Sequence, residues 1–434
     1  MGENRIGSHI VAVIGLGYIG LPVVCEFSKY FNVIAYDCNR TRVEQLSNNI
    51  DSTGTNSYRC RNEKNIKWTN DEYDLELADF FIVCVPTPVD INNKPDITCL
   101  IKATTTVGHY LRKNSIVVYE STVSPGTTEE VCQPLLEEYA KLKSGKDFFI
   151  GFSPERLCPG DDLHSLVNTD KIVSCAHENG LQKIFMVYKH VYKKGIHKTS
   201  SIRSAEAAKI LENIQRDVNI ALINEVHEVF QKDNIDTYEV IRLASTKWNF
   251  GKYFPGLVGG HCISVDPYYF IDYANKSGHP VPLVSVSRKI NEDKKDIIIE
   301  KVNSFIKNNK ITNPKIAIFG VTYKENCTDT RNSKSLLMYQ SLVNSGYEVH
   351  LNDIKLLNKS KCTTNYDINI TSVENISGCD VLIICVAHNE YKKMILSDYK
   401  KIINNESLII DMKNVINEKL NLQLSEHKIK LIKG

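Results

Sequence analysis

A cysteine in a glycine-bearing loop is the sharpest chemical feature of the sequence. Residues 259–266 read Gly-Gly-His-Cys-Ile-Ser-Val-Asp, so Cys262 follows two glycines and stands four residues before Asp266. Glycines allow the backbone to approach a ligand closely, and a thiol presented there beside an acid can act as a nucleophile. A buried cysteine in a glycine turn would give the same pattern, so this segment alone leaves both interpretations open.

Other polar residues could act together with such a thiol. Lys209, Asn213 and Arg216 are separated by four and three residues, which places them on one face of a helix. The flanking residues are small or apolar, which favours a polar cavity over open solvent around this face. Glu155 follows the apolar run 148–150, at the strand end where ligands of α/β proteins gather. It could act on a water as a general base, or it could cap a helix.

A glycine-rich segment near the N-terminus predicts a dinucleotide site. The apolar run 9–14 leads into Gly15, Gly17 and Gly20, a helical stretch follows, and Asp37 ends the next apolar run 17 residues after the last glycine. Strand, glycines, helix and acid together form the dinucleotide-binding fingerprint, with the pyrophosphate at the helix N-terminus. Asp37 can accept hydrogen bonds from both hydroxyls of the adenosine ribose and would repel a 2′-phosphate. The motif therefore favours NAD over NADP.

Two series of apolar strands must position these groups. They lie at residues 9–14, 32–37, 78–85 and 114–123, and again at 315–320, 346–353, 379–386 and 407–415. Continuous apolar strands separated by helices indicate parallel sheets that are covered on both faces. Residues 204–232 contain no Pro or Gly and predict a helix about 40 Å long. The predicted fold is α/β, with two Rossmann-like, doubly wound parallel-sheet domains joined by a long central helix.

The second α/β series differs from the first at its glycines. Gly320 stands alone where the first series has three glycines, so this half should not hold a second NAD in the same way. We expect the domains to cover residues 1–200, 201–308 and 309–434, with the cysteine loop in the central region. The central helix is a plausible surface for a homodimer.

Composition excludes several classes of protein. The chain has 434 residues, 42% apolar and 24% charged, which is ordinary for two or three globular domains. Its net charge of +2 does not point to nucleic acid or an anionic membrane as a partner. The apolar runs are far shorter than the roughly 18 residues that a spanning helix needs. The N-terminus lacks the layout of a signal peptide, so we expect the cytoplasm as the compartment.

The cysteines argue against metal and disulfide frameworks. There are 13, and none forms a Cys-x-x-Cys pair, the usual signature of zinc or iron–sulfur ligands. A disulfide scaffold is not expected in a chain of this length without an export signal. Most cysteines, including Cys84 and Cys385 in apolar runs, should be small buried hydrophobes. No metal site is predicted.

The motifs occur in an order that resembles a known family. They are Gly-Leu-Gly-Tyr-Ile-Gly at 15–20, Val-Pro-Thr-Pro at 85–88, Glu-Ser-Thr-Val-Ser-Pro-Gly-Thr at 120–127, Ser-Pro-Glu-Arg at 153–156, Ala-Glu-Ala-Ala-Lys-Ile-Leu-Glu-Asn at 205–213, Gly-Gly-His-Cys at 259–262 and Lys-Glu-Asn-Cys-Thr-Asp-Thr-Arg at 324–331. Over residues 11–415 the chain resembles the UDP-glucose/GDP-mannose dehydrogenase family, most closely the UDP-N-acetylhexosamine 6-dehydrogenase branch. The resemblance implies an N-terminal NAD domain, a dimer-forming helical connector and a C-terminal UDP-sugar domain.

The same resemblance implies a reaction and catalytic roles. The family oxidises C6 of a nucleotide sugar from alcohol to carboxylate with two NAD molecules in succession. A thiolate captures the aldehyde as a thiohemiacetal, which is then oxidised to a thioester and hydrolysed. The implied catalytic residues are Cys262 as nucleophile, Lys209 and Asn213 as oxyanion donors, Asp266 as the group that orients the lysine and a water, Glu155 as general base, and Thr122 beside the water or nicotinamide.

Binding roles follow from the resemblance as well. The cofactor would contact Gly15, Leu16, Gly17, Tyr18, Ile19, Gly20, Asp37, Arg42, Pro86, Thr87, Thr122 and Arg331. The UDP-sugar would contact Glu155, Arg156, Lys209, Asn213, Arg216, Lys247, Trp248, Phe250, Tyr253, Gly259, His261 and Lys324. Among these, the lysines suit a diphosphate, and the aromatic side chains could pack on a base or a sugar.

Two departures from the UDP-glucose branch narrow the substrate. That branch has a second Glu where this chain has Pro159, and a Lys where this chain has Val265. UDP-N-acetylglucosamine is therefore favoured, with UDP-N-acetylmannosamine or UDP-glucose as alternatives, and the product would supply a surface polysaccharide. A two-electron Rossmann dehydrogenase that does not use Cys262 is an alternative of a different class. A catalytically inactive binding protein is a third class, against which the presence of Cys262, Lys209, Asn213 and Glu155 together argues. No motif supports binding to nucleic acid or membrane.

Overall fold

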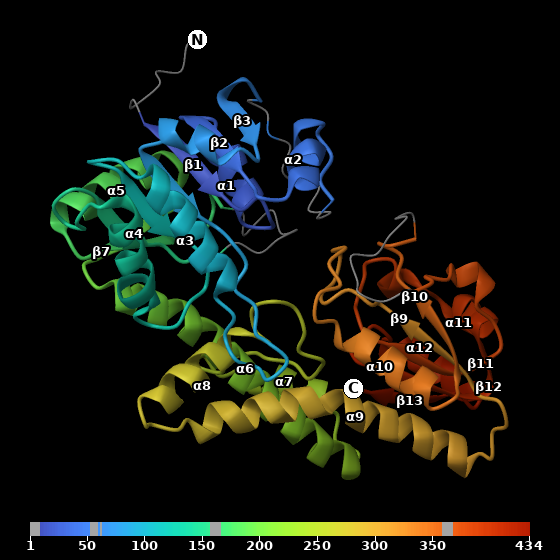
Figure 1. The fold of residues 1–434 in the computed structure, drawn as a ribbon. Helices are drawn as coiled ribbons and strands as arrows, with labels where there is room; N and C mark the ends of the chain where they lie inside the picture. The colour runs from blue at the N-terminus through green and yellow to red at the C-terminus, as the bar shows by residue number, and fades with distance from the viewer. Residues whose placement is uncertain (1–8, 53–59, 61–62, 157–165, 358–367) are drawn as a thin grey trace. The chain divides into compact units, whose positions relative to one another are not determined.

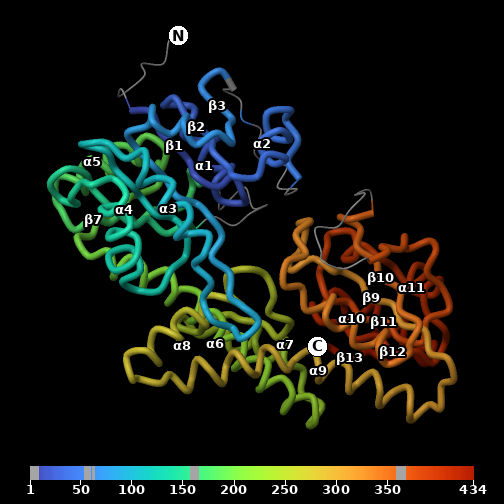
Figure 2. Tube along the Cα trace, in the orientation of Figure 1, coloured from blue at the N-terminus to red at the C-terminus, as the bar shows by residue number. Residues whose placement is uncertain are grey.

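The computed structural model describes residues 9–52, 60, 63–156, 166–357 and 368–434. The chain divides into two compact units, which are drawn in Figure 1 and traced in Figure 2. The first unit contains residues 1–212 and 268–280, and the second contains residues 213–267 and 281–434. Each unit is built around its own sheet.

The first unit is organised by a mostly parallel sheet. Its described strands are β1 (Ile10–Ile14), β2 (Asn32–Tyr36), β3 (Ile66–Thr69), β4 (Phe80–Val83), β5 (Ile116–Tyr119), β6 (Phe149–Phe152), β7 (Lys171–Cys175) and β8 (Ile196–Thr199). They lie in the order β3-β2-β1-β4-β5-β6-β7-β8, which begins with the 3-2-1-4-5-6 order of dinucleotide-binding folds. Neighbouring strands are parallel except β6 and β7, which are antiparallel.

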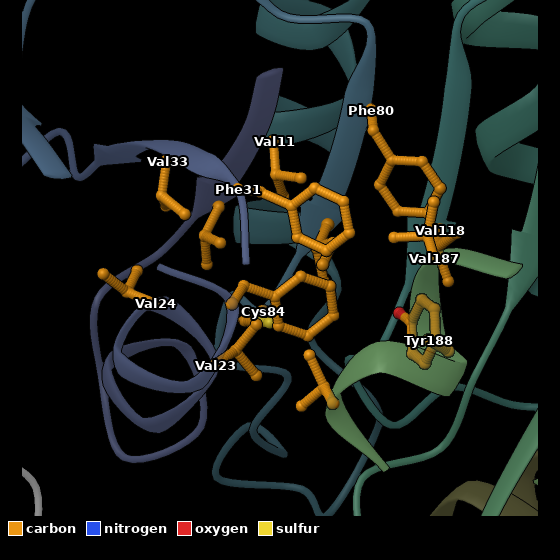
Figure 3. Close-up of a cluster of buried hydrophobic side chains, with 14 of the residues drawn as sticks. Val11, Val23, Val24, Phe31, Val33, Phe80, Cys84, Val118, Val187 and Tyr188 are labelled. Carbon is orange, nitrogen blue, oxygen red and sulfur yellow. The ribbon is translucent and has the colours of Figure 1, made fainter. Parts of the chain in front are cut away.

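Helices cover both faces of this sheet. In β1, Val11 and Val13 face a cluster that includes α1 (Gly20–Phe27) and α5 (Glu178–Val191), while Ala12 and Ile14 face α3 (Thr98–Tyr110) and α4 (Gln133–Ala140). This strand is apolar at every position because both of its faces are buried. Figure 3 shows side chains of β1, β2, β4, β5, α1 and α5 meeting in the first cluster. A further helix, α2 (Arg40–Ser47), follows β2.

The central segment is helical, as the sequence predicts. Helix α6 spans Ile202–Lys232, begins in the first unit and ends in the second. It is followed by α7 (Thr237–Ala244), α8 (Asp266–Lys276) and α9 (Pro282–Asn308). Among the described residues, no helix is both long enough and apolar enough to cross a membrane.

The second unit contains the other parallel sheet. Its described strands are β9 (Lys315–Phe319), β10 (Glu348–Asn352), β11 (Cys379–Ile384), β12 (Ile403–Asp411) and β13 (Lys430–Lys433), in the order β10-β9-β11-β12-β13. Apolar residues of α9 and α10 (Lys334–Asn344) cover one face, and those of α11 (Leu396–Ile402) and α12 (Glu418–Glu426) cover the other. Both halves of the chain are thus α/β with parallel sheets, which confirms the predicted fold class.

The cysteines differ from the expectation in one respect. Cys25 in α1 and Cys60 form a disulfide across 35 positions of sequence, and no spacing pattern marks this pair because the fold alone brings the two residues together. Cys84 and Cys385 are buried thiols, as predicted. Within the described ranges, no group of three or more His, Cys, Asp or Glu side chains is arranged to hold a metal.

Candidate active site

The glycine loop of the first unit connects β1 to α1 by a tight turn. Gly15 has φ +92°, and its N–H donates to the carbonyl oxygen of Tyr36 at 2.9 Å. A Cβ added to Gly20 would lie 1.8 Å from the carbonyl oxygen of Gly15, so only glycine permits this approach of helix to strand. A Cβ on Gly17 would have no described atom within 4 Å. The two ends of the loop, Gly15 and Gly20, are therefore packed against each other, and Gly17 between them borders open space.

Two charged side chains hold this loop at Leu16. Asp37, directly after β2, accepts a hydrogen bond from the Leu16 N–H at 2.8 Å and another from the Asn39 N–H at 2.9 Å. Arg42 in α2 donates from Nε to the Leu16 carbonyl oxygen at 2.9 Å and from Nη1 to Asp51 at 2.9 Å. Asp37 is half-buried, whereas Arg42 is buried against the loop. The structure thus places Arg42 as a support of the glycine loop.

Three further residues expected to contact the cofactor, Pro86, Thr87 and Thr122, follow strand ends of the same sheet. Pro86 and Thr87 follow β4, and the Thr87 carbonyl oxygen accepts a hydrogen bond from the Tyr269 hydroxyl at 2.9 Å. Thr122 follows β5 and is half-buried. Because β1, β4 and β5 are parallel neighbours, all of these residues lie at the carboxyl edge of the sheet, near the glycine loop.

Glu155 lies at this carboxyl edge too, three residues after β6. Its carboxylate accepts hydrogen bonds from the Arg156 N–H at 2.8 Å and from Lys171 Nζ at 2.9 Å. Lys209 in α6 donates from Nζ to the main-chain oxygen of Glu155 at 2.8 Å. Arg156 Nε bonds Glu212 at 2.9 Å. The first unit therefore brings Lys209, Glu155 and Arg156 together.

The cysteine loop belongs to the second unit. Cys262 is half-buried, and its carbonyl oxygen accepts the N–H of Asp266 at 2.8 Å, in the turn that enters α8. The Asp266 carboxylate is 1% exposed and accepts a hydrogen bond from Asn213 Nδ2 at 2.6 Å. Gly260 adopts φ +85°, and a Cβ there would lie 2.8 Å from the Tyr323 ring. The second unit thus brings Cys262, Asp266 and Asn213 together.

Residues from the C-terminal half flank this loop. Arg331 forms a two-pronged ion pair with Asp329 and lies 3.2 Å from Nδ1 of His261. A Cβ on Gly259 would lie 2.7 Å from the main-chain oxygen of Asn332, so the loop and the segment after β9 are in close contact. Lys324 in the same segment is half-buried.

The remaining substrate-binding candidates belong to the second unit. Lys247, Trp248 and Phe250 follow α7 and are exposed, Trp248 by 92%, while Tyr253 is half-buried. Arg216 on α6 is exposed. Val265 is buried beside Asp266, and Pro159 lies outside the described residues.

Comparisons with known proteins decide the family. Three domain models of the UDP-glucose/GDP-mannose dehydrogenase family match the chain: its NAD binding domain at residues 9–194, its central domain at 203–293 and its UDP binding domain at 317–418. The chain belongs to the UDP-glucose/GDP-mannose dehydrogenase family. It is an NAD-dependent nucleotide-sugar dehydrogenase, which confirms the predicted family, enzyme class and cofactor.

Relatives match this dehydrogenase over nearly its whole length. Protein CapL of Staphylococcus aureus is 42% identical over 409 residues, which cover 94% of this chain and 96% of CapL. The UDP-N-acetyl-D-glucosamine 6-dehydrogenase of Pseudomonas aeruginosa is 38% identical over 411 residues, with 94% and 97% covered. The solved UDP-D-ManNAc dehydrogenase of Pyrococcus horikoshii superposes with a TM-score of 0.85 at 30% identity and covers 94% of this chain and 96% of its own.

The glycine loop of this dehydrogenase fits NAD. The open space at Gly17 leaves room for a pyrophosphate against the backbone, and the N-terminus of α1 faces it. Each Asp37 oxygen already accepts one hydrogen bond and keeps a second lone pair for a ribose hydroxyl.

The UDP binding domain has a different loop after its first strand. Asp353, directly after β10, is fully buried and accepts hydrogen bonds from the N–H groups of Val321 and Thr322 at 2.8 and 3.2 Å. His388 accepts the Asn326 N–H at Nδ1, so Nε2 donates to Asp353 at 3.2 Å. These bonds occupy Asp353 and hold the segment that precedes and includes Asn326.

Sequence reasoning missed residues at the carboxyl edges of both sheets. Glu120 was noticed only as part of a motif, and Lys171 and the Asp353–His388 pair were not singled out. The position of Glu120 directly after an apolar strand was an available signal. The position of Lys171 depends on the antiparallel direction of β7, for which the sequence carries no marker.

Proposed function

We propose that this dehydrogenase oxidises C6 of UDP-N-acetylglucosamine to the carboxylate through a thioester on Cys262, and that the product serves surface polysaccharide synthesis. The observation that carries this proposal is the hydrogen bond from half-buried Asn213 to buried Asp266, whose own N–H donates to the carbonyl oxygen of half-buried Cys262. A fixed amide donor and a carboxylate next to a thiol suit nucleophilic catalysis at a carbonyl.

The proposed reaction uses these side chains in sequence. Bound NAD accepts one hydride from C6 in each of two oxidations. Between them, the Cys262 thiolate forms a C–S bond to the aldehyde carbon, and the resulting alkoxide is held by Asn213 and Lys209 until it is protonated. After the second oxidation, water attacks the thioester, the C–S bond breaks and the thiolate leaves. One alcohol, two NAD⁺ and one water give one carboxylate, two NADH and three protons.

Glu155 is the proposed general base for the attacking water. Its carboxylate is fixed from one side by Lys171, and Lys209 holds its main-chain oxygen. This arrangement ties the base and one proposed oxyanion donor to the same short segment. General bases of this kind must be placed within hydrogen-bond reach of the proton that they remove.

The choice of sugar rests on relatives and on two positions of the sequence. The Pseudomonas relative named for UDP-N-acetyl-D-glucosamine is 38% identical, against 30% for the Pyrococcus enzyme named for the mannosamine epimer. Pro159 and Val265 replace the Glu and Lys expected in the UDP-glucose branch. UDP-N-acetylglucosamine is therefore the proposed substrate, and UDP-N-acetylmannosamine is the second candidate.

The stoichiometry of NADH tests this proposal. UDP-N-acetylglucosamine, UDP-N-acetylmannosamine, UDP-glucose and GDP-mannose are each supplied in limiting amount with excess NAD. We expect two NADH per UDP-N-acetylglucosamine and little from UDP-glucose, with acid formation abolished in Cys262→Ala. One NADH per sugar, or normal acid output from Cys262→Ala, would overturn the cysteine mechanism. Two NADH from another sugar would retain the mechanism and replace the substrate.

We also propose a homodimer formed through the central helix, within domains at residues 1–200, 201–308 and 309–434. Leu211, Leu222 and Val229 are each more than half exposed, and their spacing of 11 and 7 residues places them on one face of α6. A row of exposed apolar side chains suits an interface between copies. Sedimentation of the wild type and of Leu222→Arg tests this, and a monomeric wild type would refute it.

A further inference from the structure

A buried lysine lies behind the proposed general base. Strand β7 runs antiparallel to β6, so its first residue, Lys171, lies at the sheet edge where β5 and β6 end. Lys171 Nζ donates to Glu155 Oε2 at 2.9 Å and to Glu120 Oε2 at 2.9 Å. The exposed fractions of Lys171, Glu120 and Glu155 are 1%, 1% and 5%. All three belong to the first unit.

The cluster holds more negative than positive charge. Two carboxylates share one ammonium, and the Tyr188 hydroxyl donates to the other oxygen of Glu120 at 2.5 Å. The rings of Tyr192 and Tyr188 flank Lys171 Nζ at 4.9 and 5.8 Å. Figure 3 shows Tyr188 on the side of the apolar cluster where Phe80 and Val118 also lie. Because the cluster is buried, it is costly to keep both carboxylates ionised beside a single ammonium.

The pKa of Glu120 reflects this imbalance. Burial raises it to about 7; the positive charge of Lys171 opposes the rise, and the negative charge of Glu155 adds to it. The cluster therefore favours the uptake of one proton, for which the carboxylates of Glu120 and Glu155 compete.

Glu155 belongs both to this buried cluster and to the candidate active-site residues of the first unit. Its Oε2 accepts a hydrogen bond from Lys171 Nζ, its Oε1 accepts the Arg156 N–H, and its main-chain oxygen accepts Lys209 Nζ. Among the described residues, the charged groups around Glu155 include Lys171 from β7, Glu120 after β5, Lys209 from α6 and the Arg156–Glu212 pair, and Cys84 and Tyr192 are neutral titratable neighbours.

We propose that Lys171 and Glu120 are positioning residues that set the ionisation of Glu155 during thioester hydrolysis. Lys171 keeps the Glu155 carboxylate charged and fixes its orientation, and Glu120 adjusts that effect by competing for the same ammonium. This inference rests on the proposed function, because it assigns the base step to Glu155. The two added residues are almost fully buried, and their proposed effect is exerted through Glu155.

The two residues act with opposite signs, and this makes the proposal testable. Lys171→Met removes the cation, so Glu155 should accept a proton more readily. The acid limb of the pH–rate profile for thioester hydrolysis should therefore move to higher pH. Glu120→Gln removes a competing negative charge while its amide oxygen can still accept from Tyr188, so the limb should move to lower pH. Each displacement should be about one pH unit, as expected for charges in direct contact.

The measurement is the decay of the acyl adduct on Cys262. The enzyme is mixed with UDP-N-acetylglucosamine and NAD, quenched at intervals from pH 5 to pH 9, and its adduct is quantified by intact-protein mass spectrometry. In Lys171→Arg the acid limb of the pH–rate profile should stay at the wild-type position, because arginine retains the positive charge. Lys183→Met, at an exposed position of α5, is the matched lysine control and should leave the limb unchanged.

The outcomes separate this inference from the proposed function. Opposite displacements in Lys171→Met and Glu120→Gln support the inference, whereas unchanged limbs or displacements of the same sign overturn it. If Lys171→Met fails to fold, Glu120→Gln decides alone, because only a displacement to lower pH agrees with the proposal. A wild-type enzyme that never forms an adduct would overturn the proposed function, and the inference with it.

Discussion

Asp37 and Asp353 occupy equivalent positions in the two sheets and have opposite surroundings. Each follows the strand beside the first strand of its sheet and accepts hydrogen bonds from the loop after that first strand. Asp37 is half-buried, whereas Asp353 is fully buried against Val321, Thr322 and His388. The same acid therefore remains accessible to a ribose in one domain and is a structural element in the other.

The first prediction concerns cofactor choice. Asp37→Asn keeps an acceptor for the Leu16 N–H but removes the negative charge, so the preference for NAD over NADP should fall by about tenfold or more, as expected when a hydrogen bond to a charged group worth about 1.5–3 kcal/mol is weakened. The ratio of kcat/KM for the two cofactors measures this. Asp353→Asn is the matched control and should leave the ratio unchanged. An unaltered ratio in Asp37→Asn would contradict the assignment of Asp37 to the ribose.

A pair of alanine substitutions tests the glycine loop. Gly17→Ala places its methyl group in open space, so thermal stability should be retained while the KM for NAD rises severalfold because the pyrophosphate loses room. Gly20→Ala would force a carbon to 1.8 Å from the Gly15 carbonyl oxygen, so the loop must shift and the melting temperature should fall. Calorimetry and NAD titration of both variants distinguish the two effects. Equal loss of stability in both would contradict this division.

Some strands and site residues of this fold carry a clear sequence pattern, and others do not. Strands such as β1 and β4 were predictable because a parallel strand that is buried on both faces is apolar at every position. Strands β3 and β8 are short and partly exposed, so they lack that signature. The site was predictable at its motifs, but Lys171 was not, because its place beside Glu155 depends on the direction of β7. The single Gly320 predicts that Asp353 does not serve NAD as Asp37 does, but the burial of Asp353 and its contact with His388 are visible only in the structure.

Removal of the proposed base should stop the reaction at the thioester. In Glu155→Gln, both oxidations can proceed, so we expect a burst of two NADH per active site followed by slow turnover. Steady acid formation should fall by about a hundredfold or more, the usual contribution of general base catalysis. Intact-mass measurement should show the acyl adduct on Cys262. Glu138→Gln, at an exposed position of α4, is the control; rapid acid formation by Glu155→Gln would assign the base elsewhere.

The last prediction concerns the pH dependence of stability at His227, which joins α6 to the C-terminal strand. Its Nε2–H donates to the Lys433 carbonyl oxygen at 3.0 Å, and Nδ1 accepts from the Thr237 hydroxyl at 2.8 Å. Burial, with the nearby charge of Lys294, lowers the pKa of His227 to about 4 from its ordinary value of 6.5. The unfolded chain therefore binds more protons than the folded chain between these values, so this residue destabilises the fold as pH falls below 6.5.

The buried carboxyl of Glu120, with its raised pKa, acts in the opposite direction, so the informative quantity is the difference between wild type and His227→Gln. Between pH 7 and pH 5, the wild type should lose about 2 kcal/mol more unfolding free energy than the variant. Urea unfolding followed by a probe in the second unit measures this. His279→Gln, at an exposed position before α9, should show the wild-type dependence. Parallel pH profiles for wild type and His227→Gln would mean that His227 is protonated in the folded enzyme, and the neutral hydrogen-bonded bridge to Lys433 would be wrong.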